Sequence, residues 1–142
     1  MSIEKIQEEI ISEFEILGDD RESTIYYIME LGGNLDEFPE SERKDENIIK
    51  GCQSKVWLTA EEIDGKIHFL ADSNTDITKG LISLLIRVLD NRTPDEIIHA
   101  ELNFIERIGM GNIIGSQRSN GLASMIKQMK LYAIAFQTKL NA

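Results

Sequence analysis

The apolar residues of this 142-residue chain change their spacing along the sequence, and that change limits the folds that it can adopt. Residues 55–60 and 66–70 are rich in β-forming residues, and Asp64-Gly65 between them suits a tight turn. The segments on either side carry apolar residues at helical spacing. This order predicts an α+β fold: a small antiparallel sheet of two to three strands, with the helices packed on one face.

Upstream of the hairpin, the spacing predicts a helix over 3–17, stopped by Gly18. A second helix is expected to begin after Asp19-Asp20 and to end at Gly32-Gly33. Residues 34–50 are polar and acidic, which indicates a loop with a turn of helix at most.

Downstream, Ser73 and Asp76 resemble a capping box that opens a helix through Leu89. This helix is apolar nearly all round, so we expect it at the centre of the core. Thr93-Pro94 is a stronger helix start, and a last long helix is expected after Asn120-Gly121.

Composition and charge narrow the class of protein. The chain is 42% hydrophobic and 28% charged, which suits one ordinary core, and we expect residues 1–142 to form a single domain. Net charge is −10, concentrated in the first 46 residues. The bases are too dispersed for nucleic-acid binding, so the asymmetry marks either a protein-docking surface or solvated helix faces. No stretch is apolar enough to span a membrane, and the acidic N-terminus predicts a cytoplasmic protein.

The chain has one cysteine, Cys52, and two histidines, His68 and His99, far apart in sequence. One cysteine and two separated histidines predict no disulfide within the chain and no metal site. The glycines at 109–111 fit no phosphate-binding motif and indicate a flexible turn. Asp72 and Asp76 invite an acid–base interpretation, but carboxylates at a helix start are common for dipole reasons alone.

Cys52 follows Gly51, which can take a positive φ and hold the thiol at the tip of a loop. From this spacing alone, an inert buried thiol and a reactive one both stay open. Lys50 and Lys55 lie close enough in sequence to lower the pKa of the thiol.

Longer motifs point to one family. The run Ile49-Lys50-Gly51-Cys52-Gln53-Ser54-Lys55-Val56-Trp57-Leu58 resembles the signature of the SufE family, sulfur acceptors in iron–sulfur cluster assembly. The similarity continues, in family order, at Tyr27–Gly32, Ala71-Asp72-Ser73, Thr78–Ile82, Thr93-Pro94 and Ser116–Leu122.

This resemblance implies a single SufE-like domain with the fold shared by SufE and the cluster scaffold proteins. It implies that Cys52 receives persulfide sulfur from a cysteine desulfurase, stimulates that enzyme and passes the sulfur to a Suf assembly scaffold complex. Gly51, Gln53, Ser54 and Asp72 are the expected supporting residues, together with Arg118, which matches a family arginine in a loop near the cysteine. Asn74 stands where the family usually has an aspartate, so no carboxylate role is carried over to it.

In this scheme the chain is a sulfur carrier and activator rather than a stand-alone enzyme. It needs no cofactor, because the pyridoxal phosphate belongs to the desulfurase; a homodimer is left open. Ile48, Ile49, Val56 and Trp57 surround Cys52 in sequence, so we expect the thiol to be partly buried at rest and to swing outward on docking. Two other functions stay open: an iron–sulfur scaffold, and a hydrolase with Cys52 as nucleophile and His68 or His99 as base.

Overall fold

The structure, a computed structural model, describes residues 1–141. Within this range, β1 (Val56–Ile63) and β2 (Lys66–Ser73) pair antiparallel as a two-stranded sheet. Asp64 and Gly65 join them with φ angles of 53° and 83°, the pair of positive values that a type I′ turn needs. The predicted hairpin is therefore confirmed.

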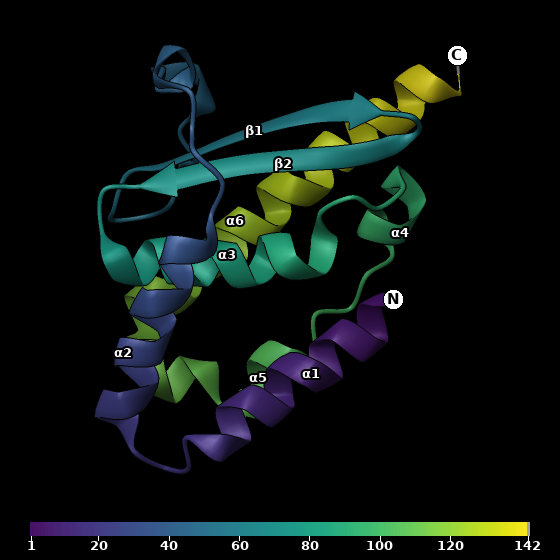
Figure 1. Cartoon of the computed structure of the whole chain (residues 1–142). Helices are drawn as coiled ribbons and strands as arrows, with labels where there is room; N and C mark the ends of the chain where they lie inside the picture. Colours follow the sequence, from purple (N-terminus) through teal and green to yellow (C-terminus); the bar gives the residue numbers. More distant parts are fainter. Residues whose placement is uncertain (142) are drawn as a thin grey trace.

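Helices precede and follow the hairpin (Figure 1). Short 3₁₀ turns lie between the second helix and β1, at Gly32–Asn34, Glu40–Glu42 and Asp45–Asn47. The α-helices are α1 (Ile3–Ile16), α2 (Arg21–Leu31), α3 (Asp76–Leu89), α4 (Pro94–Ile98), α5 (Phe104–Ile108) and α6 (Met110–Leu140).

The two faces of the sheet differ in what covers them. Val56 and Leu58 of β1 and Ile67 and Phe69 of β2 point inward and are almost completely buried. Figure 1 shows α3 and α6 along this face, while the 35–48 segment crosses the opposite face. The α+β architecture with helices on one side of a small sheet is confirmed, because each strand alternates apolar and polar side chains between the faces.

Helix α3 is the central buried helix that its composition predicts. Leu81, Ile82 and Leu85 are each at most 1% exposed. Gly80 lets α3 approach α2 closely, since a Cβ there would collide with the Ile28 carbonyl oxygen.

Two predicted helix starts are wrong. Ser73 is the last residue of β2 and donates its hydroxyl to the Lys55 carbonyl at 2.7 Å, so the N-cap of α3 is Thr75. The last helix begins before Asn120-Gly121. The chain is already helical from Met110, with a break at Gly115 (φ 84°, ψ 171°). Met110 and Ile114 of this upstream stretch are buried in the core, and their packing overrides its weak helix propensity.

The start of α4 matches its prediction, with a complete capping box between Thr93 and Glu96. Helix α5 is absent from the sequence-based prediction because no local cap marks it. Its first N–H, from Phe104, donates to the side chain of Gln7 on α1 at 3.0 Å. The same buried glutamine donates to the Glu101 carbonyl, so contacts between residues that lie 94 and 97 positions apart in the sequence define this helix.

Candidate functional site

The site begins at the tight loop that leads into β1. Ile49 donates its N–H to the Val56 carbonyl at 2.8 Å and closes the loop. Gly51 has a φ of +94°, as predicted, and a Cβ at this position would lie 2.5 Å from the Ser124 hydroxyl of α6. Both the backbone angle and the close approach to α6 therefore require glycine.

The Cys52 thiol is half-buried, which confirms the expected partial burial. Its Sγ donates to the Gly121 carbonyl of α6 at 3.5 Å. A Cβ on Gly121 would lie 3.4 Å from this sulfur, which is ordinary van der Waals contact, so helix and thiol are closely packed here. Burial raises the pKa of the Cys52 thiol, and the predicted lowering by Lys50 and Lys55 is wrong. At rest the cysteine is a neutral, weakly nucleophilic thiol.

Cys52 lines a cavity of about 110 Å³ between the loop, α3 and α6. Three of the predicted supporting residues line it too: Gln53 and Ser54 from the loop, and Arg118 from α6. Arg118 lies in the first helical turn after the Gly115 break rather than in a loop. Its side chain is exposed, its Nη1 is 3.5 Å from the Ile114 carbonyl oxygen, and no carboxylate among residues 1–141 pairs with it.

Three hydroxyl groups form a ring in the wall of this cavity. The Ser54 and Thr75 oxygens are 2.9 Å apart, Thr75 donates to Thr78 at 2.8 Å, and Thr78 donates to Ser54 at 3.2 Å. Neither threonine is among the site residues predicted from the sequence. A usable signal was present, because residues three apart in the first turn of a helix share a face.

Asp72 does not join the cavity. It lies opposite Trp57 on the outer face of the sheet, where its carboxylate pairs with Arg43 at 2.5 Å and with Lys79 at 3.5 Å. Burial favours a higher pKa for Asp72, but the Ser73 N–H and the charges of Arg43 and Lys79 outweigh it and lower the pKa. The other carboxylate of the acid–base interpretation, Asp76, is exposed in the first turn of α3.

Asn74 has a structural contact that an aspartate would reproduce. Its Oδ1 accepts the Lys55 N–H at 3.0 Å, and its own N–H donates to the Lys55 carbonyl at 3.2 Å. The side-chain oxygen fastens the end of the Cys52 loop to the end of β2, and this contact needs no charge.

Neither histidine lies in the Cys52 cavity. His68 contacts Asp90, and His99 contacts Asp95 within its own helix turn. Among residues 1–141, no three His, Cys, Asp or Glu side chains are grouped so that they could hold a metal ion. The same part of the chain contains no helix with the length and apolar character needed to cross a membrane.

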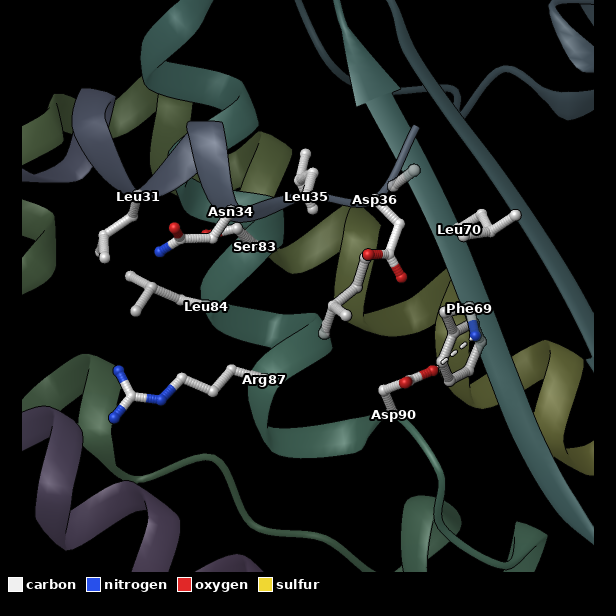
Figure 2. Close-up of a pocket in the computed structure, with 12 residues that line it drawn as sticks. Leu31, Asn34, Leu35, Asp36, Phe69, Leu70, Ser83, Leu84, Arg87 and Asp90 are labelled. Carbon is white, nitrogen blue, oxygen red and sulfur yellow. Dashed lines mark hydrogen bonds between the residues drawn. The ribbon is translucent and has the colours of Figure 1, made fainter. Parts of the chain in front are cut away.

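A second cavity, of about 290 Å³, lies on the other side of α3 (Figure 2). It contains none of the predicted site residues, and two of its charged side chains already have partners. Asp90 accepts the Phe69 N–H at 2.7 Å, and Arg87 pairs with Glu13 at 2.5 Å. The Cys52 thiol therefore lies in the smaller of these two cavities.

Comparison with known proteins decides the family. Residues 8–133 match the model of the SufE family, described as an Fe-S metabolism associated domain. The chain belongs to the SufE family. Its match includes the Cys52 loop, the hairpin and most of α6, and it associates this SufE-family domain with iron–sulfur metabolism.

Relatives agree with this assignment. The SufE-family chain is 36% identical over 128 residues to an uncharacterized SufE-like protein of Rhizobium meliloti strain 1021, covering 87% of this chain and 91% of that protein. It is 38% identical over 106 residues to an uncharacterized SufE-like protein of Synechocystis, covering 75% and 67%. A solution structure of a hypothetical protein from Thermus thermophilus shares the fold, with a TM-score of 0.76 at 16% identity over 94% and 96% of the two chains.

Proposed function

We propose that this SufE-family chain accepts persulfide sulfur on Cys52 from a cysteine desulfurase and delivers it to an iron–sulfur assembly scaffold. The observation that carries the proposal is the placement of the chain's one cysteine. Cys52 lies on a glycine-hinged loop in the wall of a small cavity, with Arg118 at the same cavity.

The transfer step balances with one cysteine. The Cys52 thiolate attacks the outer sulfur of the desulfurase persulfide, R–S–SH; the new bond joins Cys52 Sγ to that sulfur. The S–S bond of the donor breaks, and the desulfurase cysteine leaves as a thiolate. Removal of the product frees the desulfurase for another turnover, so the acceptor stimulates it. A second exchange at the scaffold regenerates Cys52.

The contacts of the loop support a swing of Cys52 toward its partner. In the 51–53 stretch, the side chain of Cys52 makes one long S–H···O hydrogen bond, to the Gly121 carbonyl. Directly after this stretch, Ser54 bonds to Thr75, and both backbone groups of Lys55 bond to the end of β2. Movement is therefore expected between Gly51 and Gln53, while the base of the loop stays in place.

The resting state also supports a role for the partner in activation. A neutral thiol that donates to a carbonyl is a poor nucleophile, and burial disfavours the thiolate. Docking that draws Cys52 out of the cavity removes both effects. The histidine positions favour this function over a hydrolase, because a base within hydrogen-bond reach of the nucleophile is needed for hydrolysis.

The test is an intact-mass measurement after incubation with a cysteine desulfurase and sulfur-labelled cysteine. We expect one added sulfur, located on Cys52 by peptide mapping, and faster desulfurase turnover. Cys52→Ser is nearly isosteric at a half-buried position, so it should fold normally and reduce both signals to background. Stimulation that survives in Cys52→Ser, or a wild-type chain that stays unlabelled beside an active desulfurase, contradicts the proposal.

A further inference from the structure

The hydroxyl ring of Ser54, Thr75 and Thr78 has no role in the transfer step described above. Thr75 is the N-cap residue of α3, yet its side chain accepts no backbone N–H from the first turn. The Thr75 hydroxyl donates instead to Thr78, a residue that is 5% exposed. A threonine at this position ordinarily stabilises the helix by about 1 kcal/mol through its cap bond. Here the hydroxyl is oriented toward its two neighbours in the cavity wall.

We propose that these three hydroxyls form a donor cradle that holds the outer sulfur of the Cys52 persulfide as an anion. This inference rests on the proposed sulfur-acceptor function. It adds Ser54, Thr75 and Thr78 as positioning residues for the cargo of that function.

Space in the cavity permits this. Its volume of about 110 Å³ exceeds the roughly 30 Å³ that a water-sized atom occupies. Cys52 already lines the cavity, so an added sulfur has room without displacement of the loop. Ile77, Leu81 and Met125 supply the apolar part of the wall and limit the access of water.

Charge in the cavity favours an anion over a neutral group. Among its lining residues Arg118 is charged and positive, Cys52 is titratable, and the α3 side chains Thr75, Ile77, Thr78 and Leu81 are neutral. Hydroxyl hydrogens rotate freely, so each can turn from its neighbour in the ring to an incoming sulfur anion. Hydrogen bonds to a charged acceptor are stronger than the neutral ones they replace, and more so at low dielectric.

Loading also changes which atom ionises. In the free thiol, the proton lies on Sγ and is donated to Gly121. In the persulfide the proton lies on the outer sulfur, one bond farther from Gly121, and Sγ itself carries none. The hydroxyl ring then supplies donors to the ionised outer sulfur from the α3 side of the cavity, while Arg118 lines the cavity from α6.

The test compares the loaded wild type with loaded Thr75→Val and Thr78→Val. Each protein is loaded with a small-molecule persulfide, R–S–SH, which transfers its outer sulfur and leaves as a thiolate, so no desulfurase is needed. Alkylation of the outer sulfur by iodoacetamide is followed against pH by mass spectrometry. We expect the pH midpoint for alkylation to rise by about one unit in each variant, because the ionised outer sulfur loses one charge-assisted hydrogen bond. Reduction by dithiothreitol should become about tenfold faster.

Two further variants make the result specific. Thr78→Ser keeps the hydroxyl and should restore the wild-type midpoint. Thr24→Val removes a buried helical hydroxyl that bonds to the Asp20 carbonyl outside the Cys52 cavity, and should change neither value. If Thr78→Val does not fold, Thr75→Val, at a less buried position, gives the same comparison.

An unchanged midpoint and reduction rate in the valine variants overturn the cradle and leave sulfur acceptance by Cys52 intact. A wild-type chain that loads from the small persulfide but not from a desulfurase overturns the proposed function, while the cradle is still measured. Failure to load from either donor overturns both.

Discussion

The two stretches of chain that precede β1 are held in different ways. In the 35–50 segment, the Arg43 guanidinium pairs with Asp72 at 2.5 Å and Glu40 at 2.8 Å and stacks over the rings of Phe38 and Trp57. In the adjoining 51–53 stretch, the Cys52 side chain has one 3.5 Å contact to Gly121.

The difference teaches where this fold is rigid and where it can respond to a partner. Ion pairs and aromatic contacts fix the outer face of the sheet, while hydrogen bonds of Ser54 and Lys55 hold the base of the loop. The nucleophile is held by burial and one weak donor, so displacing it breaks few interactions. Asp72, expected from the sequence to support the cysteine, instead pairs with Arg43 and Lys79 on the rigid outer face of the sheet.

The largest effect is expected for Gly51→Ala, which places a side chain at the border of the two stretches. The positive φ of Gly51 and the 2.5 Å approach to Ser124 should together reduce the free energy of unfolding by about 2–4 kcal/mol. Gly18→Ala is the matched control: it has φ +65° but open space around the added Cβ, so only about 1 kcal/mol is expected. Urea denaturation measures both. Equal losses would show that contact with α6 does not hold the loop.

A smaller effect, on transfer rather than stability, is expected for Arg118→Ala. The side chain is exposed and pairs with no carboxylate in residues 1–141, so its removal should change stability by no more than about 0.5 kcal/mol. Sulfur transfer from the desulfurase should slow several-fold, because a cation at the cavity is lost. Lys127→Ala, an exposed cation on the same helix outside the cavity, should leave transfer unchanged. A large loss of melting temperature in Arg118→Ala would make the arginine structural instead.

The smallest effect is expected for Arg43→Met, which removes the ion pairs of Arg43 in the 35–50 segment and leaves the contacts of the 51–53 stretch in place. At pH 7 the melting temperature should fall by a few degrees while sulfur loading stays unchanged. Asp72 has a lowered pKa in the folded chain, so its pairing stabilises the fold above its ordinary pKa and is lost as pH falls through the folded value. The difference between wild type and variant should therefore shrink below about pH 4.

Arg107→Met is the control for this last variant, since it removes a more exposed pair with Glu8. Calorimetry across pH measures both. Slower sulfur loading in Arg43→Met would show that the two stretches are coupled.

Much of the fold could be predicted because its signals are local. Asp64-Gly65 carries its own turn preference, and Thr93 to Glu96 carries a complete cap. The failures occurred where distant contacts compete with local ones. Ser73 resembles a cap but bonds to Lys55 across the hairpin, and α5 depends on Gln7. The placement of Asp72 had a signal in the alternation of Ile67, Phe69 and Ala71, which points Asp72 outward.

By itself the sequence determined the hairpin, most of the helices and Cys52 as the candidate nucleophile, because spacing, turn residues and family motifs are properties of short segments. Only the tertiary structure decided the state of that nucleophile. Gly121, 69 residues away, accepts the thiol proton, and α3 and α6 bring Thr75, Thr78 and Arg118 to its cavity. Burial and hydrogen-bond partners depend on which segments meet, and they determine whether a thiol is reactive or at rest.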